Sequence, residues 1–314
     1  MKTLVIFKIA FVICLLAVAP ARAQSVWHVP TDFATIQDAL DAGAVVDGDT
    51  ILIEPGYHLG AIVNKSVEIK GLGGAVIDDG PLHSSGLSQG FRLVAGSGGT
   101  SISHLTFMTD LSIMNGEAID DVTVTQNTFL NSIQAISNWR GNRWQISHNK
   151  IQDLHTRCGG GIGILIGDYT GGSVEDNVVS HNTITGDVTF PEGDCGGYDG
   201  SGIVIYADFR WDRLGAANIS YNRVIKNKVS VVPSPEGATT NPVGANAFEL
   251  TDTRDMPDAP VICYNKIGFN DFRGSDTQIV LTPSTLSGCN EISRNFGKNR
   301  GHGSHPSVFG PGGV

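Results

Sequence analysis

The residues best suited to chemistry gather in two stretches, 195–213 and 249–255, where aromatic rings lie beside carboxylates and arginines. Rings stack on sugar faces, while charged groups bond to hydroxyls or to uronate carboxylates. This mixture favours an acidic polysaccharide as the ligand. The residues expected to contact it are Tyr198, Asp199, Trp211, Arg213 and Arg254.

Cleavage of a uronate chain by β-elimination is the preferred reaction. It needs a cation that neutralises the carboxylate and a base beside the C5 proton of the sugar. The aspartates that could hold calcium are Asp208, Asp212, Asp252 and Asp255. The candidates for the base are Arg210, Tyr206 and His155. Elimination would yield unsaturated products that absorb in the ultraviolet.

Hydrolysis would instead require two carboxylates that face each other across the scissile bond. Glu249 and Asp208 are the pair expected for that reaction. A non-catalytic secreted glycan-binding or surface protein would use the same side chains for recognition alone. In a further alternative, the acids and arginines pair with one another and hold the loops in place.

The elements that position these residues follow from a repeat of the form apolar-x-x-Asn-x-apolar. Its members are Leu105, in place of Asn, then Asn127, Asn149, Asn177, Asn222, Asn265 and Asn290. The spacings between them are 22, 22, 28, 45, 43 and 25 residues. A period in the low twenties with alternating β-branched residues is typical of a solenoid of short strands. We expect each Asn to adopt a left-handed corner and to bond to the next Asn in the stack.

A second strand is expected in each coil, stacked on its counterpart one coil away. Its apolar centres are Ile119, Ile136, Ile164, Ile203, Phe248 and Ile279. Glu249 should point outward from this strand, because Phe248 and Leu250 on either side of it point inward. The fold predicted is therefore all-β, a single-stranded right-handed parallel β-helix.

The repeat also locates the inserted loops. Asn177 to Ile203 and Asn222 to Phe248 are each 26 residues, whereas Asn127 to Ile136 is 9. Counting forward, the spans from Ile203 and Phe248 to the next Asn are also long, at 19 and 17 residues. Long loops on a regular scaffold usually carry function, so we expect a groove bordered by loops on both sides of these two strands.

The ends of the chain have their own signatures. Residues 1–23 read as an export signal, with an apolar run after Lys2 and Lys8. The domain then spans 24–314, with a capping helix at 35–43 and a loose tail at 301–314. No later apolar run reaches the roughly 20 residues of a membrane span. A secreted or periplasmic monomer is expected.

Charge and cysteines limit the functional classes. The net charge of the full chain is −10, and removal of the signal's three bases makes it 18 − 31 = −13, which disfavours nucleic acids and anionic membranes. The four cysteines after the signal suit two disulfides in an exported protein rather than zinc. Stacked loops place Cys158 beside Cys195 and Cys263 beside Cys289.

Four segments, 32–40, 48–57, 67–73 and 76–78, together resemble the first coil of right-handed parallel β-helix proteins of the pectin-lyase-like superfamily. The resemblance covers nearly the whole exported chain. It implies the fold, with substrates lying along one strand face, and a family of lyases, hydrolases, esterases, epimerases and adhesins. Pectinesterase, polygalacturonase and alginate-epimerase signatures are absent, so no single reaction is implied.

Overall fold

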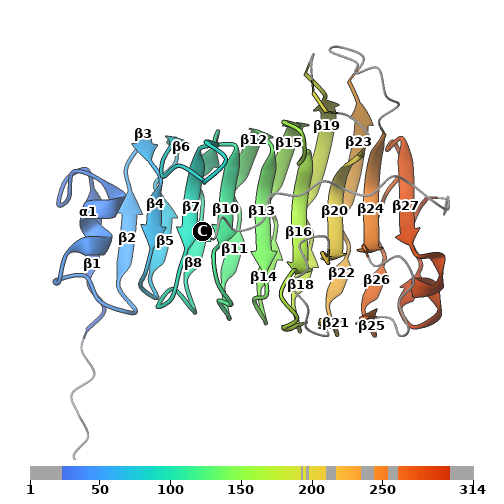
Figure 1. Cartoon of the computed structure of the whole chain (residues 1–314). Helices are drawn as coiled ribbons and strands as arrows, with labels where there is room; N and C mark the ends of the chain where they lie inside the picture. The colour runs from blue at the N-terminus through green and yellow to red at the C-terminus, as the bar shows by residue number, and fades with distance from the viewer. Residues whose placement is uncertain are drawn as a thin grey trace, which may run out of the picture.

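Short strands rich in Val, Ile and Phe build the molecule, since β-branched and aromatic side chains pack well on pleated surfaces. The computed structural model describes residues 23–191, 194–195, 198–209, 217–234, 244–253 and 261–297. Successive strands enter different sheets, and each strand pairs in parallel with its counterpart one coil away. Figure 1 shows the resulting stack, from the N-terminal coil in blue to the C-terminal coil in red. The predicted parallel β-helix is confirmed.

Sheet 1 is the ten-stranded sheet. Its strands are β1 (Val26–Val29), β2 (Thr50–Ile53), β5 (Glu68–Gly71), β8 (Ser101–Ser103), β11 (Thr123–Thr125), β14 (Gln145–Ser147), β18 (Val178–Ser180), β22 (Arg223–Ile225), β26 (Lys266–Gly268) and β28 (Glu291–Ser293). Sheet 2 has eight strands. They are β4 (Ala61–Val63), β7 (Gln89–Leu93), β10 (Leu111–Asn115), β13 (Gln134–Trp139), β16 (Ile162–Asp168), β20 (Gly200–Ala207), β24 (Ala245–Asp252) and β27 (Thr277–Thr282).

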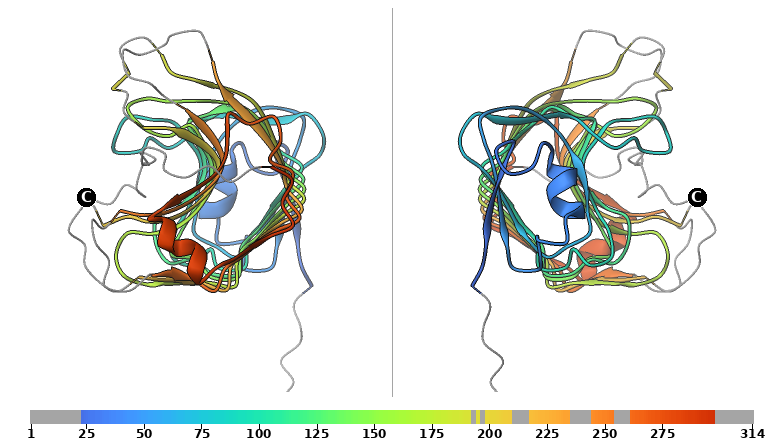
Figure 2. Two further views of the ribbon diagram at one scale, coloured as in Figure 1. Left: turned by 90° about the vertical axis from the view of Figure 1, so that its right-hand side faces the viewer. Right: turned by 90° about the vertical axis from the view of Figure 1, so that its left-hand side faces the viewer.

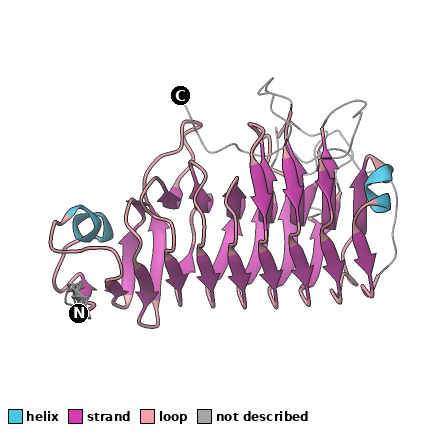
Figure 3. Cartoon of the chain, turned by 90° about the horizontal axis from the view of Figure 1, so that it is seen from below, coloured by secondary structure: helices cyan, strands magenta, loops and turns pink. Residues whose placement is uncertain are grey.

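Sheet 3 has seven strands. They are β3 (Gly56–Leu59), β6 (Ala75–Asp79), β9 (Thr106–Phe107), β12 (Thr128–Ser132), β15 (Lys150–His155), β19 (Thr183–Thr189) and β23 (Lys228–Pro233). A fourth, short sheet holds β17 (Ser173–Glu175), β21 (Asn218–Ser220) and β25 (Ile262–Cys263). Seen end-on in Figure 2, the coils superpose around a common interior, and Figure 3 shows the strands stacked in rows.

The interior is a set of apolar ladders. In sheet 2, Ile136, Ile164, Ile203, Phe248 and Ile279 are consecutive partners in register, as the sequence predicts, and all are buried. The assignment of Ile119 to this ladder is wrong. Ile113 of β10 pairs with Ile136 instead. Ile119 lies after β10, in the connection to β11, where its carbonyl accepts a hydrogen bond from the Trp144 indole.

The asparagines form two ladders, whereas the sequence predicts one. The first ladder runs through Asn127, Asn149, Asn182, Asn227, Asn270 and Asn295. The second runs through Asn177, Asn222, Asn265 and Asn290. The short sheet explains the difference, because it adds a corner to each coil from β17 onward and that corner also carries an Asn. Asn177 and Asn182 thus belong to one coil.

The expected left-handed asparagine is also corrected. Positive φ angles occur at the residue before most ladder asparagines, such as His148 at 56° and His181 at 57°, and at no ladder asparagine. The asparagine follows the turn, and its amide closes it. Asn149, for example, donates through Nδ2 to the Val124 carbonyl at 2.8 Å and to Asn182 Oδ1 at 3.0 Å. The expected bond from one Asn to the next is confirmed.

A short helix, α1 (Ile36–Asp41), lies between β1 and β2, inside the predicted range 35–43. Thr35 caps it, with reciprocal bonds to Asp38 of 3.0 and 3.1 Å. The helix ends before Gly43, at the extended residue Ala42. Ile36 and Leu40 are buried in the main core. Its role as a cap stays a prediction, and a 3-10 helix, η1 (Ser284–Gly288), precedes the last strand.

Two disulfides join neighbouring coils with the predicted pairing, Cys158–Cys195 and Cys263–Cys289. The described part of the chain contains no helix with the length and apolar character needed to cross a bilayer. Most of the predicted export signal, residues 1–22, and the predicted tail, 301–314, lie outside the described residues.

Candidate functional site

The long connections occur where the repeat predicts them, on both sides of β20 and β24. They are 190–199 and 208–217 around β20, and 234–244 and 253–261 around β24. Around β13 the corresponding connections are residue 133 and residues 140–144. Parts of all four long connections lie outside the described residues, so the groove between them stays a prediction.

The outer face of sheet 2 carries a second apolar cluster. We call the set of Leu87, Leu111, Met114, Ile133, Trp139, Ile162, Leu165, Val204 and Tyr206 the outer cluster, and each member is at most 1 % exposed. It spans the strands from β10 to β20. On the next strand, β24, polar side chains take over the same face. Glu249 lies where this face changes from apolar to polar side chains.

Glu249 is a buried carboxyl in a row of apolar side chains. Its partners in register are Val204 of β20 and Val280 of β27, and Leu165 precedes Val204 in the same row. Its neighbours Phe248 and Leu250 belong to the main core, so Glu249 faces outward. The side chain is nevertheless 0 % exposed.

Three side chains donate hydrogen bonds to this carboxyl. The donors are Ser201 Oγ at 2.8 Å, Thr251 Oγ1 at 2.6 Å and Asn246 Nδ2 at 3.3 Å. These bonds favour the charged form, but burial outweighs them and raises the pKa of Glu249 to about 7. The negative charge of Asp199 acts in the same direction. A carboxyl with this pKa can both give and take a proton near neutral pH.

Further carboxylates lie at the edge where β20 and β24 begin. Asp199, which is partly exposed, accepts a hydrogen bond from the Gly244 backbone N–H at 2.8 Å. A methyl group added at Gly244 would lie 3.2 Å from Asp199 Oδ1 and 3.4 Å from Asp276 Oδ2, so both carboxylates flank this glycine. Glu249 reaches toward the same edge, since its partner Ser201 is two residues from Asp199. Two residues along a strand cover roughly 7 Å.

The predicted pair, Glu249 and Asp208, lies at different positions along the strand direction. Val204 is the register partner of Glu249, and Asp208 lies four residues farther along. The two backbone positions are thus about 13 Å apart along the strands, and the pairing of these two carboxylates stays a prediction. Asp208 and Asp252, at 2 % and 1 % exposure, lie where β20 and β24 end.

The calcium site stays a prediction, because Asp212 and Asp255 lie outside the described residues. Among the described residues, one group of side chains has the spacing of metal ligands, namely Cys158, Asp194 and Cys195. Its two cysteines are joined in a disulfide and are therefore not available as thiolate ligands.

The two predicted tyrosines are buried. Tyr198 is 5 % exposed, packs against Phe190 and donates its hydroxyl proton to Asp194. Burial raises the pKa of this hydroxyl. Asp194 also accepts from the Cys158 backbone N–H at 3.1 Å, so Tyr198 secures the loop held by the disulfide. Tyr206 is fully buried in the outer cluster.

His155 lies away from Glu249, near the ends of β12 and β15. Its Nδ1 is 2.7 Å from the Asn131 carbonyl, and its Nε2 is 3.6 Å from Asp110. The contact with His155 holds the pKa of Asp110 below its usual value, and bonds from Ser88 add to this effect. The remaining predicted site residues lie outside the described residues. They are Arg210, Trp211, Arg213 and Arg254.

The three donors to Glu249 are not among the site residues predicted from the sequence. The donors are polar residues on the outer face of sheet 2, namely Ser201, Asn246 and Thr251. In the preceding coils much of the same face is apolar. Polar residues clustered at such positions were the available signal. The partner geometry itself depends on stacking between two coils that are 45 residues apart in sequence.

Comparison with known proteins adds little to this description. No protein-family model matches the chain. A cell surface glycoprotein of Methanothermus fervidus is 25 % identical over 147 residues, which are 44 % of this chain and 22 % of that protein. The chain thus spans under two thirds of that relative. Among solved structures, tailspike protein gp49 of Acinetobacter baumannii bacteriophage Fri1, a capsular polysaccharide depolymerase, aligns with 91 % of this chain and 62 % of that chain, at 11 % identity and a TM-score of 0.32.

Proposed function

We propose that this protein hydrolyses an acidic polysaccharide outside the cytoplasm, with Glu249 as the general acid. The observation that carries the proposal is the Glu249 carboxyl itself. Burying a carboxyl on a face otherwise lined by Leu165, Val204 and Val280 is costly, even with three donors around it. Groups kept at such a cost, with a pKa of about 7, are typical of proton-transfer sites.

Asp199 is the proposed base. Its partly exposed carboxylate lies close enough to Glu249 for its charge to raise the pKa of that carboxyl, which supports pairing the two groups as base and acid. Asp199 would take a proton from water as that water forms a bond to the anomeric carbon. Glu249 would give its proton to the glycosidic oxygen as the carbon–oxygen bond breaks, and this step requires the carboxyl, which is 0 % exposed, to become accessible to the substrate. Proton exchange with solvent then restores both groups.

The acidic character of the substrate and the location rest on separate arguments. The connections that follow β20 and β24 contain Arg210, Arg213 and Arg254 in sequence, and arginines pair with uronate carboxylates. Two disulfides between coils are typical of proteins in oxidising compartments.

A second candidate function is glycan binding without catalysis. The complete burial of Glu249 and Tyr206 favours it, because buried groups make no contact with a substrate. In that case the Glu249 network would hold β20 and β24 together.

Product analysis separates the proposals. The purified protein is incubated with pectate, alginate, a glycosaminoglycan and neutral glycans, with and without calcium or a chelator. Hydrolysis predicts new reducing ends without ultraviolet absorbance on at least one acidic glycan. Glu249→Gln and Asp199→Asn should each lower kcat by about 100-fold or more. Glu291→Gln is the control, since Glu291 is exposed and pairs with Lys266 at 3.0 Å.

Two outcomes would overturn hydrolysis. Unsaturated products would establish elimination instead, and glycan binding with no product on any substrate would establish the second candidate. A Glu249→Gln variant that keeps the wild-type rate would remove Glu249 from the mechanism.

A further inference from the structure

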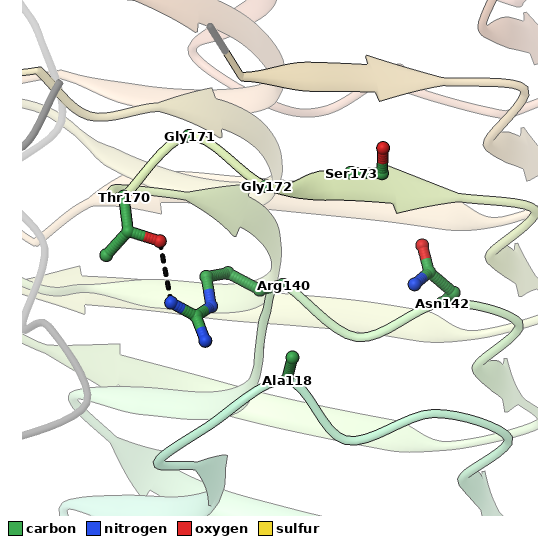
Figure 4. A pocket seen from close by; sticks show the side chains of 7 residues that line it. All are labelled: Ala118, Arg140, Asn142, Thr170, Gly171, Gly172 and Ser173. Carbon is green, nitrogen blue, oxygen red and sulfur yellow. Dashed lines mark hydrogen bonds between the residues drawn. The ribbon is translucent and has the colours of Figure 1, made fainter. Parts of the chain in front are cut away.

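A pocket of about 490 Å³ opens on a different corner of the β-helix, where β10, β13 and β16 end. Its lining residues are Ala118, Arg140, Asn142, Thr170, Gly171, Gly172 and Ser173. They come from three successive coils, so the solenoid stack assembles the pocket from segments about 20–30 residues apart in sequence. Figure 4 shows the Arg140 guanidinium near Thr170, with Asn142 and Ser173 farther along the same surface. The volume lies within the range of sites for small ligands.

The backbone holds Arg140 in place. This residue follows β13 with a φ of 63°, and its N–H donates to the Gly167 carbonyl at 2.8 Å. Its side chain makes one hydrogen bond, from Nη1 to Thr170 Oγ1 at 2.7 Å. The other guanidinium donors have no hydrogen-bond partner among the described residues, although arginine offers five N–H groups in a planar fork.

The acid beside the pocket, Asp168, makes no direct bond to this arginine. Its carboxylate accepts from the Gly171 N–H at 2.6 Å and from the Gly172 N–H at 3.0 Å. It also accepts from the Thr170 backbone N–H at 3.2 Å and the Thr170 hydroxyl at 3.3 Å. Arg140 forms no ion pair with any carboxylate that the structure describes. Its charge is therefore available to a ligand.

Arg143, on the same corner, shows the contrasting arrangement. Its Nε lies 2.7 Å from Asp121, and its Nη2 lies 3.1 Å from Asp120. Both acids are thus engaged by Arg143, and Asp120 accepts a further bond from Asn142 at 3.1 Å. The chain has a net charge of −10, and two carboxylates pair with the exposed Arg143. No carboxylate that the structure describes pairs with Arg140 in the pocket.

We propose that the Arg140 pocket binds the carboxylate of a uronic acid sugar, separately from the Glu249 site. The guanidinium fork matches a carboxylate with two parallel bonds, and the Thr170, Ser173 and Asn142 side chains can meet sugar hydroxyls. The unpaired Arg140 guanidinium in the pocket indicates a ligand with a carboxylate. The choice of a sugar as its carrier rests on the proposed function.

The test measures binding without turnover. Calorimetric titration at low salt compares D-glucuronate, D-glucose and inorganic sulfate, none of which carries a bond that the proposed hydrolysis could cleave. We expect glucuronate to bind and glucose to bind at least tenfold more weakly. Arg140→Ala should weaken glucuronate binding about tenfold or more, since hydrogen bonds to charged groups are strong. Arg140→Lys keeps the charge but cannot form two parallel bonds to a carboxylate. Its affinity for glucuronate should therefore lie between those of the wild type and Arg140→Ala.

Arg143→Ala is the matched control and should leave affinity within twofold. Equal loss in Arg143→Ala and Arg140→Ala would overturn the pocket as the site, because it would show a diffuse charge effect. Sulfate binding as tight as glucuronate would overturn the sugar ligand. Failure of hydrolysis with retained glucuronate binding would contradict the proposed function alone, whereas hydrolysis with no Arg140-dependent binding would contradict this inference alone.

Discussion

At the scale of single residues, the balance at Glu249 decides its chemistry. Removal from water disfavours the carboxylate, whereas bonds from Ser201, Thr251 and Asn246 favour it, and burial is the larger effect. The adjacent Asp199 adds repulsion. The carboxyl is therefore protonated over a wider range of pH in the folded chain than in the unfolded one.

This balance predicts a pH-dependent stability. The pKa of Glu249 rises from 4.5 to about 7 on folding, so the folded state binds more protons between these values. The stabilisation is complete below pH 4.5 and is lost as pH rises through 7. Its size is about 3 kcal/mol for a shift of this extent. Urea unfolding of wild type and Glu249→Gln at several values from pH 5 to pH 8 measures it.

Glu249→Gln should remove this contribution to the fall in unfolding free energy with rising pH, while Glu291→Gln should retain it. Glu291 is the control because its pKa is lowered by Lys266 rather than raised. Identical pH profiles for wild type and Glu249→Gln would show that the carboxyl is not desolvated in solution.

At the scale of elements, the corners depend on the asparagine ladders. Asn182 accepts from the Asn149 N–H at 3.0 Å and donates to the Ile146 carbonyl at 2.9 Å and to Asn227 Oδ1 at 3.0 Å. It is 1 % exposed. One side chain thus satisfies two buried backbone groups of the preceding coil and bonds to the asparagine of the following coil, which an apolar residue could not do.

Truncation of a ladder member should therefore be costly. Asn182→Ala leaves a buried N–H and a buried carbonyl without partners, and we expect a loss of about 3 kcal/mol in the free energy of unfolding. Asn218→Ala is the control, because Asn218 is exposed and belongs to neither ladder. Denaturant midpoints of the two variants give the comparison. Equal losses would show that the ladder amides add nothing beyond a surface asparagine.

At the scale of the whole molecule, each coil contacts only the coils on either side of it, so stability is approximately a sum of local contributions. The last coil has a neighbour on one side only. The Cys263–Cys289 disulfide ties this coil, through residues just before β28, to the coil before it. The Cys158–Cys195 disulfide joins loops beside β16 and β20 in the interior of the stack.

Removal of the terminal disulfide should therefore act locally. The cross-link closes a separation of 26 residues, and its loss by Cys263→Ser with Cys289→Ser should cost about 3.5 kcal/mol in the chain-entropy model. Hydrogen exchange should then show lost protection in β26 and β28, with β2 to β11 unchanged. Cys158→Ser with Cys195→Ser should instead expose the region of β16 and β20. Uniform loss across all coils in either variant would contradict this locality.

Much of the fold follows from local pattern. The period of the repeat, the inward ladder from Ile136 to Ile279 and the outward direction of Glu249 follow from strand alternation and stacking. The cysteine pairing could also be predicted from the sequence, because residues at corresponding positions in adjacent coils are neighbours in space. These features depend on residue spacing alone, and spacing is present in the sequence.

Tertiary structure decided the rest, because burial and pairing depend on which coils stack. The fourth strand in the later coils separated Asn177 from the ladder of Asn149, whose next partner is Asn182 instead. Burial raised the pKa of Glu249, and the Asp168 carboxylate bonds to the backbone of Gly171 and Gly172 rather than to Arg140. The residues that could do chemistry are visible in the sequence, but their burial and partners depend on contacts between coils, such as the bond from Ser201 to Glu249.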